Sequence, residues 1–268
     1  MVDPRFYDVI YDINPHMTGK LGTVDKKRAR EEWESLKGAY ETIGFPVVVL
    51  EPKKNLPDMV FAANQSFPFL DRNGKKKVIL SNMATKERAP EVAFFADWYR
   101  QQGYEVIHLK TQNPFEGMGD LLVHPNRDWL WGGFGFRTKK EVYGEIEKIV
   151  QKSVHLLELM DNRFYHLDTC LSILDETTAL YYPKAFDPNG IQLLEENFET
   201  LIEVSAKEAL NGFACNAHSP DGKHILIQKG NERVKRELIK KGFDVMELET
   251  SEFLKSGGSV FCLKMMIG

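Results

Sequence analysis

The sequence predicts a single closed α/β domain in which one structural unit recurs around a central axis. Five times, a short apolar run is followed by a second strand-like run that carries polar or reactive groups. A helical pattern precedes several of these pairs, and no Pro- or Gly-rich linker divides residues 1–268. Because a repeated fold brings equivalent positions together, we expect residues far apart in sequence to share one site. The apolar runs begin at Val47, Val106, Val154, Leu201 and Val245.

The clearest helices end on a glycine that is followed by an aromatic residue and a strand. Over 25–43, apolar residues recur at the three-and-four spacing of one helical face, and Gly44 stands where a C-cap glycine belongs. The same pattern predicts helices over 90–103 and 231–242. The segments IGFPVVVL, QGYEVIHL and KGFDVMEL repeat this order of residues. Weaker helical patterns cover 142–149 and 191–199.

Further strands are predicted in the gaps that follow the second run of the first four units. They lie near Val78, Trp129, Ala179 and His224, in KKVILSN, WLWGGFGF, ALYYP and HILIQKG. Each unit then holds two or three strands and one helix packed outside them, which is a radial arrangement.

Composition favours a soluble protein that acts on a small molecule. The 268 residues are 43% apolar, and the net charge of -4 comes from interspersed residues, 35 basic and 39 acidic. This predicts no nucleic-acid surface and no membrane anchor. The N-terminus MVDPRFYDVI lacks the apolar core of a secretory signal, which predicts a cytoplasmic location. The sequence leaves a homo-oligomer open.

Three widely spaced cysteines are expected to be free thiols, because their spacing matches neither a disulfide framework nor a zinc motif. One of them, Cys262, follows the turn Ser256-Gly257-Gly258-Ser259. Two glycines there permit positive φ and a close approach of backbone to ligand. Cys262 is therefore either a nucleophile presented at the rim of a strand or a small buried residue in the strand VFCLKM.

Acidic residues and a histidine occupy equivalent positions in other units. His166 and Asp168 alternate, so in a strand they face the same side. Glu116 and Asp120 flank glycines in FEGMGD. These groups suit either a metal site or a cysteine hydrolase that grips a planar guanidinium between carboxylates. No HxxxH or HExxH spacing supports the metal, and the hydrolase accounts for more of the residues.

The motifs PDMVFAANQ, FEGMGD, FYHLDT, GFRT and GGSVFC together resemble the guanidino-group-modifying superfamily of arginine deiminases, dimethylarginine dimethylaminohydrolases and amidinotransferases. The resemblance covers essentially the whole chain. It is closest to the catalytic N-terminal domain of cyanobacterial arginine dihydrolases, also through YDINPHM, FACNA and FLKSGG. The resemblance implies a pentein-type fold, a five-bladed α/β propeller with helices outside and the active site at the axis.

The resemblance also implies roles for individual residues. Cys262 would be the nucleophile, His166 the general acid and base, Asp168 a ligand of the guanidinium nitrogens, and Glu116 a partner of His166 or of the substrate. No metal and no cofactor is implied. Substrate-binding roles fall to Asn14, Asn64, Asp120, Arg88, Arg137 and Gly258. Without the resemblance, Asn14 would be interpreted as a turn residue before Pro15, and Arg137 as a surface cation.

Asn64 in FAAN decides which reaction is predicted. Deiminases and dimethylarginine hydrolases of the superfamily carry an acidic residue there, whereas the dihydrolases carry asparagine. An amide donates as well as accepts hydrogen bonds, so it tolerates the neutral ureido group of citrulline. The sequence therefore predicts hydrolysis of arginine to ornithine, ammonia and carbon dioxide. The alternatives are a hydrolase that gives citrulline, an amidinotransferase, and a propeller that only binds a ligand.

Overall fold

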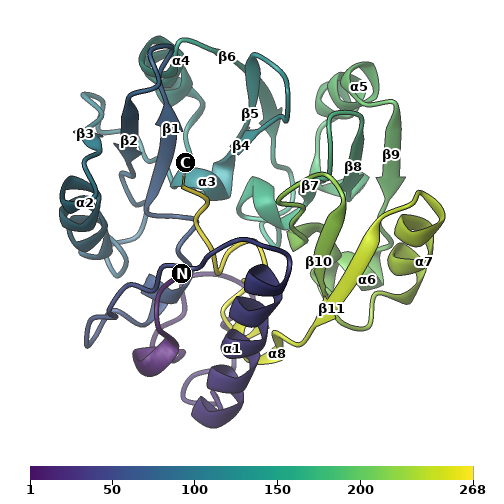
Figure 1. Ribbon diagram of the computed structural model, residues 1–268, viewed down its shortest axis with the longest axis horizontal. Helices are drawn as coiled ribbons and strands as arrows, with labels where there is room; N and C mark the ends of the chain where they lie inside the picture. The colour runs from purple at the N-terminus through teal and green to yellow at the C-terminus, as the bar shows by residue number, and fades with distance from the viewer. Residues whose placement is uncertain (268) are drawn as a thin grey trace.

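The computed structural model describes residues 1–267, whose strands form four separate sheets. Figure 1 shows these sheets arranged around a common centre, with the longer helices on the outside and both chain ends near the middle. The sheets contain β1 (Ser66–Leu70), β2 (Lys76–Leu80) and β3 (Glu105–Ile107); β4 (Leu121–Val123), β5 (Trp129–Phe134) and β6 (Ser153–Glu158); β7 (Leu171–Ile173), β8 (Thr178–Tyr181) and β9 (Thr200–Glu203); and β10 (His224–Gln228) and β11 (Asp244–Leu248).

Three of the sheets have the same topology. The first two strands pair antiparallel, and the third joins parallel to the second after an outer helix, as in β4, β5 and β6. The fourth sheet keeps the parallel pair β10 and β11, and its antiparallel partner is a single bridge from His218 to Leu226. Outside these sheets, one isolated parallel bridge joins Val2 and Leu50. The α/β repeat predicted from the sequence is thus visible in the strand pairing.

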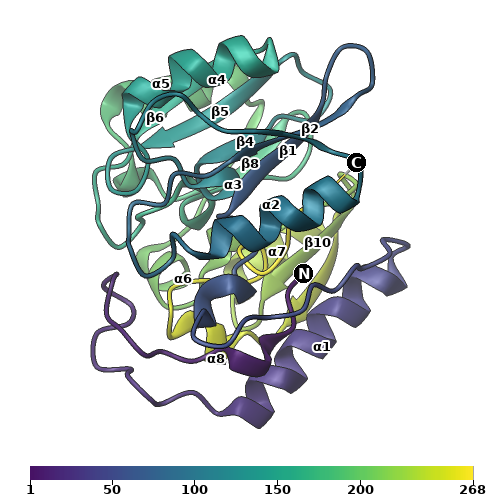
Figure 2. The same cartoon turned by 90° about the vertical axis from the view of Figure 1, so that its left-hand side faces the viewer.

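The helices predicted from the sequence are confirmed to within a few residues. Figure 2 shows α1 and α2 running along the outside of the molecule. The α-helices are α1 (Lys26–Thr42), α2 (Glu91–Gln101), α3 (Gly117–Asp120), α4 (Tyr143–Val150), α5 (Pro188–Asn197), α6 (Ala206–Leu210), α7 (Glu232–Lys240) and α8 (Ser251–Leu254). No helix among the residues described is long and apolar enough to cross a bilayer.

The recurring glycine-aromatic pair is a helix-terminating motif. Gly44 has a φ of 90°, and the N–H of Phe45 donates to the carbonyl of Tyr40 at 3.0 Å. The equivalent bond ends the other two helices: the N–H of Tyr104 donates to the carbonyl of Tyr99 after α2, and the N–H of Phe243 donates to the carbonyl of Leu238 after α7. Positive φ without a Cβ penalty is what this motif requires of its glycine. The motif turns each chain segment from its outer helix toward the centre.

The second strand-like run of each unit differs from the prediction, because it begins as a tight helical turn. His166 is extended, but Asp168 lies in a 3₁₀ turn where the N–H of Thr169 donates to the carbonyl of His166 at 3.2 Å. Cys262 lies in a turn over 260–263, and no strand follows it in the described residues. The 3₁₀ helices are η1 (Pro4–Phe6), η2 (Pro57–Val60), η3 (Lys140–Val142), η4 (Leu167–Thr169), η5 (Pro183–Ala185) and η6 (Ala214–Asn216).

The hydrophobic core supports these central turns from outside. Helix α1 buries Trp33 and Leu36 in a cluster that also contains Phe253, Val260 and Cys262. Each fully buried side chain of this size contributes about 2 kcal/mol to folding. The apolar face of α1 therefore holds the segment that carries Cys262.

Candidate active site

The thiol of Cys262 is held by the third and fourth units. Sγ donates a hydrogen bond to Oδ2 of Asp168 at 3.0 Å and accepts one from Nδ2 of Asn216 at 3.2 Å. Oδ1 of Asn216 accepts from the backbone N–H groups of Ser259 and Cys262 at 3.0 and 3.3 Å, and Nδ2 also donates to the carbonyl of Asp168 at 2.8 Å. Asn216 thus fixes both the turn and the sulfur atom.

Burial governs the ionisation of this pair. It raises the pKa of Asp168 to about 7, against the opposing hydrogen bond from Cys262. Burial also raises the pKa of Cys262 well above its usual value, and the neighbouring Asp168 raises it further. With its pKa raised in this way, the sulfur is a thiol at neutral pH. A cation that enters beside Asp168 favours the thiolate, which is the nucleophilic form.

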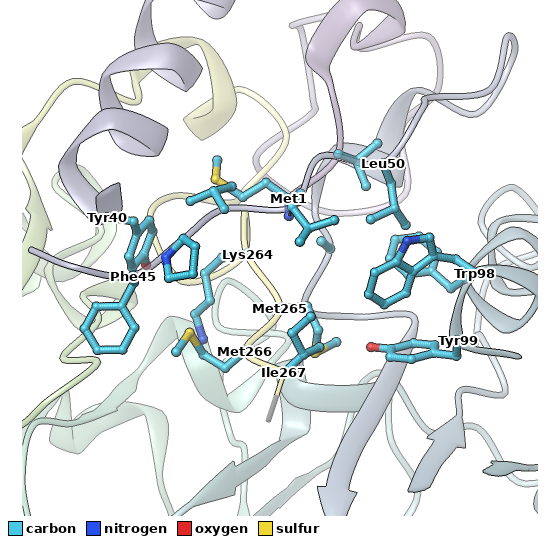
Figure 3. A pocket seen from close by; sticks show the side chains of 16 residues that line it. Met1, Tyr40, Phe45, Leu50, Trp98, Tyr99, Lys264, Met265, Met266 and Ile267 are labelled. Carbon is cyan, nitrogen blue, oxygen red and sulfur yellow. Dashed lines mark hydrogen bonds between the residues drawn. The ribbon is translucent and has the colours of Figure 1, made fainter. Parts of the chain in front are cut away.

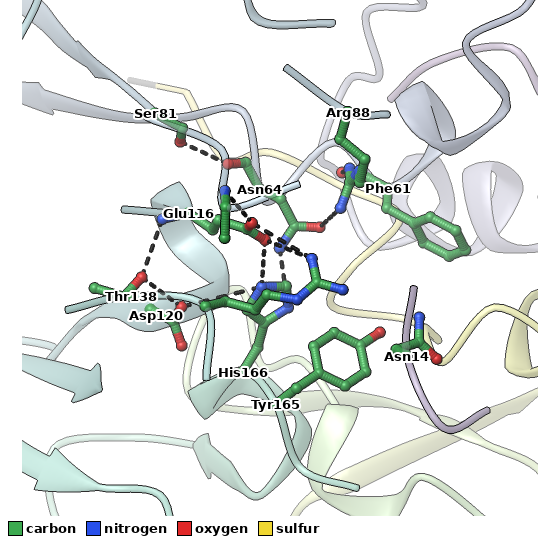
Figure 4. A network of polar contacts seen from close by, with 12 residues as sticks. Asn14, Phe61, Asn64, Ser81, Arg88, Glu116, Asp120, Thr138, Tyr165 and His166 are labelled. Carbon is green, nitrogen blue, oxygen red and sulfur yellow. Dashed lines mark hydrogen bonds and ion pairs between the residues drawn. The ribbon is translucent and has the colours of Figure 1, made fainter. Parts of the chain in front are cut away.

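His166 and Glu116 form a second buried pair. Nε2 of His166 lies 2.7 Å from Oε2 of Glu116, and Nδ1 lies 3.4 Å from Nδ2 of Asn64 (Figure 4). Burial disfavours ionised Glu116, but the bond to His166 and the charges of Arg137 and Arg88 outweigh it and lower its pKa to about 2. An ionised Glu116 accepts only, so Nε2 carries a proton, and Nδ1 is assigned as the acceptor from Asn64.

Glu116 is oriented from several sides. Nη1 of Arg137 lies 3.3 and 3.4 Å from its two oxygens, and the N–H of Ala84 donates to Oε1 at 2.9 Å. Arg137 is buried, also donates to the carbonyl of Ile13 at 2.8 Å, and places its guanidinium over the ring of Tyr165. The alternative interpretation of Arg137 as a surface cation was therefore wrong.

Asn64 is positioned by Arg88 and by a glycine. Its Oδ1 accepts from Nη1 of Arg88 at 3.0 Å, and Arg88 is itself anchored by Glu91 at 3.0 Å. A Cβ at Gly119 would lie 2.3 Å from Nδ2 of Asn64, so only glycine permits this approach. The amide orientation follows from these bonds, because Oδ1 faces a donor and Nδ2 faces His166.

These groups surround one narrow pocket. Seven of the predicted site residues line it, namely Asn14, Asn64, Arg88, Arg137, His166, Gly258 and Cys262. The lining also includes Ile13, Asp58, Phe61, Tyr165, Ser256 and Gly257. Asn14 bridges the wall by donating to the carbonyl of Ser256 at 3.0 Å. The pocket therefore joins segments from both ends of the chain.

Three predicted residues stand behind the wall of this pocket. Glu116 reaches it through His166, and Asp168 reaches it through Cys262. Asp120 differs from the predicted substrate contact, because its Oδ2 accepts from Thr138 at 2.6 Å and its Oδ1 from the N–H of Leu167 at 3.0 Å. These bonds tie α3 to η4, the turn that carries Asp168.

The sequence did not single out Asp58, which lines the pocket. The residue is buried, its Oδ2 accepts from the hydroxyl of Tyr11 at 3.0 Å, and its Oδ1 has no hydrogen-bond partner among the described residues. Burial raises its pKa despite the nearby charge of Arg88. One signal in the sequence could have identified it. Asp58 lies in the segment PDMV, now η2, which opens the second run of the first unit, as the segments with Asp120 and Asp168 do in other units.

The described residues contain no group of three or more His, Cys, Asp or Glu side chains arranged to hold a metal ion. The polar groups of the pocket instead bind one another and leave a few oxygen atoms unpaired. Oδ1 of Asp168 and Oδ1 of Asp58 are buried without a hydrogen-bond partner in residues 1–267. Buried acceptors of this kind are suited to a cationic ligand with N–H donors.

We expect Asn216→Ala to destabilise the fold by about 3 kcal/mol, because it removes the partner of two buried N–H groups. It should also slow turnover, since the Cys262 turn loses its support. Urea unfolding and steady-state kinetics measure the two effects. The control is Asn197→Ala, which removes one partly buried bond to the carbonyl of Leu193. An Asn216→Ala variant as stable as this control would contradict the assigned role.

The family model described as N,N dimethylarginine dimethylhydrolase, eukaryotic, matches residues 13–267. The chain belongs to this dimethylarginine dimethylhydrolase family. A dimethylarginine dimethylaminohydrolase of Mycobacterium tuberculosis is 36% identical over all of this chain and 84% of its own length. The bifunctional arginine dihydrolase/ornithine cyclodeaminase AgrE of Nostoc is 37% identical over the whole chain, which spans only 37% of that protein.

Solved structures give the same family assignment. The N-terminal domain of ArgZ, a cysteine-to-serine mutant bound to substrate and described as an arginine dihydrolase from cyanobacteria, superposes with a TM-score of 0.91. It is 38% identical, and the match covers 98% of this chain and 95% of that domain. The resemblance to guanidino-modifying enzymes is thereby confirmed, together with an α/β fold of their type.

Proposed function

We propose that this protein is an arginine dihydrolase, which converts arginine to ornithine, two ammonia and carbon dioxide. The observation that carries the proposal is the amide of Asn64, placed 3.4 Å from His166 in the pocket that Cys262 lines. An amide at this point accepts both the cationic guanidinium and the neutral ureido group. The similarity to the substrate-bound dihydrolase domain over nearly the whole chain supports it.

The proposed fold is a five-bladed propeller with this pocket at its axis. Three sheets share one pairing scheme, the fourth keeps its parallel pair, and Val2 and Leu50 form a further parallel bridge. A short helical turn lies beside each of the four sheets. In this arrangement the fifth blade draws on both ends of the chain.

In the proposed complex, the guanidinium lies against Cys262 and Asn64, with the carboxylate of Asp168 behind the sulfur, and the α-ammonium meets the unpaired Oδ1 of Asp58. Arg137 and Arg88 supply positive charge for the α-carboxylate. Both arginines already donate to pocket residues, Arg88 to Asn64 and Arg137 to the carbonyl of Ile13, so they are fixed before the substrate arrives. Such preorganisation limits the entropy lost on binding.

In the proposed reaction, the thiol proton passes to His166 and the Cys262 thiolate adds to the guanidinium carbon. Ammonia then leaves with a proton from His166, which forms a thiouronium. Water, deprotonated by His166, adds to that carbon and expels the thiolate, giving citrulline. The Cys262 thiolate then attacks the ureido carbon of citrulline and expels a second ammonia, which leaves a thiocarbamate on the sulfur. Hydrolysis of the resulting thiocarbamate gives a carbamate, which releases ornithine and carbon dioxide.

Glu116 supports His166 through both roles. Its carboxylate stays ionised and faces Nε2 at 2.7 Å, so it stabilises the imidazolium that forms after proton transfer. The long contact to Asn64 leaves Nδ1 as the nitrogen that exchanges protons with the substrate.

The similarity to the M. tuberculosis dimethylarginine dimethylaminohydrolase favours a second candidate, a hydrolase that stops at citrulline. A product balance on arginine separates the two. We expect two ammonia and one ornithine per arginine consumed; one ammonia with citrulline would establish the second candidate. Added glycine that captures the amidino group would indicate an amidinotransferase. Absence of turnover, with no protection of Cys262 by arginine against iodoacetamide, would indicate a ligand-binding protein.

A further inference from the structure

A fully buried carboxylate opens helix α2. Glu91 is the first residue of this helix and is 0% exposed, and glutamate is almost never buried to this degree unless it is paired. Its oxygens accept hydrogen bonds from two side chains that precede α2. The donors are Nε of Arg88 at 3.2 and 3.3 Å, Nη2 of Arg88 at 3.0 Å and Nε2 of Gln65 at 2.6 Å. These bonds hold neighbouring segments rather than the start of the helix itself.

Apolar contacts already dock α2 on the molecule. The helix buries Phe95 and Tyr99 in a cluster that also contains Met59 and Val78. Figure 3 shows Trp98 and Tyr99, near the other end of the helix, at a separate apolar pocket. A buried ion pair costs desolvation that apolar side chains avoid, so it is weak evidence of a stabilising role. The packing of α2 therefore gives no reason for a buried acid at its first residue.

Glu91 restricts the guanidinium of Arg88. A guanidinium has five N–H groups in a fixed plane. Glu91 accepts from Nε and from Nη2, and the carbonyl of Asp58 also accepts from Nη2, at 3.0 Å. Because these bonds fix the plane, Nη1 stays directed at Oδ1 of Asn64, 3.0 Å away (Figure 4). The position of this donor therefore depends on Glu91.

The bond from Arg88 decides which way round the amide of Asn64 lies. Oδ1 accepts from Arg88 at 3.0 Å, and Nδ2 lies 3.4 Å from Nδ1 of His166. A half-turn of the amide would exchange acceptor and donor at both places. The contact to His166 is long and orients the amide only weakly. The shorter bond, to a charged donor, is the one that sets the orientation.

We propose that Glu91 is a positioning residue that fixes, through Arg88, the orientation of the Asn64 amide in the pocket. The inference rests on the proposed function, in which the donor group of that amide accommodates the ureido oxygen of citrulline. Glu91 itself does not line the pocket. Its removal should therefore change the partition between ornithine and citrulline more than it changes the first hydrolysis.

The test is the product ratio of Glu91→Ala, which removes every acceptor that Arg88 has at this residue. The assay is run at pH 8.5, because burial raises the pKa of Glu91 to about 7 and the ionised form accepts all of these bonds. An amide that is free to turn populates the competent orientation only in part. We expect the ratio of ornithine to citrulline to fall by about threefold or more, in proportion to that population.

A double variant separates this path from a general loss of structure. In Asn64→Asp the side chain has two equivalent oxygens, so it has no orientation to lose. Adding Glu91→Ala to it should change the product ratio by less than about twofold. The matched control is Asp97→Ala, which removes an exposed ion pair with Arg100, 2.7 Å long, at the same spacing in the same helix. The control should keep the ratio of the unchanged protein.

Two outcomes of these assays would overturn the proposal. One is a folded Glu91→Ala variant with the original product ratio, and the other is an equal shift with and without Asn64→Asp. If Glu91→Ala does not fold, Glu91→Asp takes its place. Its carboxylate is one methylene shorter, so it should lower the ratio in the same direction by a smaller factor.

NMR spectroscopy tests the inference without turnover. In protein with isotope-labelled asparagine, the side-chain amide signal of Asn64 is identified by its absence in Asn64→Asp. We expect this signal to shift or broaden in Glu91→Ala and to stay in place in Asp97→Ala. An unmoved signal in Glu91→Ala would contradict the role of Glu91. Citrulline as the sole product of the unchanged protein would overturn the proposed function instead, and the amide signal would still decide whether Glu91 orients Asn64.

Discussion

Replacement of Cys262 by serine is expected to lower kcat for arginine by on the order of 10³-fold or more, while arginine still binds. A hydroxyl is far less acidic than a thiol, so the entering cation cannot generate the nucleophile. The hydroxyl still fits the bonds that Asp168 and Asn216 make to this side chain, at 3.0 and 3.2 Å. The pocket should therefore keep its shape.

Ammonia release measures turnover in the serine variant, and titration calorimetry measures arginine binding. Cys170→Ser is the matched control, because that thiol also donates to an oxygen, the carbonyl of Leu167 at 3.5 Å, but does not line the pocket. The control should retain activity within a few-fold. A Cys262→Ser variant with more than about a tenth of the original kcat would show that another group attacks the substrate.

The outer helices could be predicted from the sequence because their signals are local. A three-and-four apolar spacing and a glycine with positive φ act within one helix, as at Gly44 after α1. The central segments were harder, since their polar backbone groups are satisfied by tertiary contacts. The carbonyl of Asn216 accepts from Phe261, and that of Cys262 accepts from Ala63, so the turns depend on other units. The apolar runs in these central segments predicted strands, because a local pattern does not register such tertiary contacts.

About half of the residues that line the pocket could be predicted from the sequence, but the roles of the carboxylates around it could not. The repeat placed Cys262 and His166 in equivalent positions, and the structure brings both to one pocket. A carboxylate can face the pocket, or it can face away and accept hydrogen bonds from groups behind the pocket wall. Which of the two occurs depends on residues that are distant in sequence. Asp120 turns to Leu167 and Thr138, whereas Asp58, with an unpaired oxygen, faces the pocket. No spacing in the sequence distinguishes these two aspartates.

Replacement of Asn64 by aspartate is expected to shift the products from ornithine toward citrulline by about tenfold or more, a change of about 1.4 kcal/mol in the relative barriers. Aspartate keeps the bond from Arg88 to the oxygen at this position, which is 3.0 Å long. The other atom becomes an acceptor. It attracts the guanidinium of arginine but repels the ureido oxygen of citrulline, so citrulline leaves before the second attack.

The same substitution changes the histidine. The second carboxylate oxygen would face Nδ1 of His166, which now lies 3.4 Å from an N–H donor. Chromatographic separation of ornithine and citrulline, at equal arginine consumed, gives the product ratio. An assay with citrulline as the substrate measures the second hydrolysis, from citrulline to ornithine, by itself.

Asn73→Asp is the control for the added charge, because it places the same carboxylate on an exposed loop. Its product ratio should match that of the unchanged protein. If Asn64→Asp instead forms ornithine in the original ratio, the amide does not decide between the two reactions. If it loses citrulline hydrolysis but still converts arginine to citrulline, Asn64 is the residue that commits this site to the second hydrolysis.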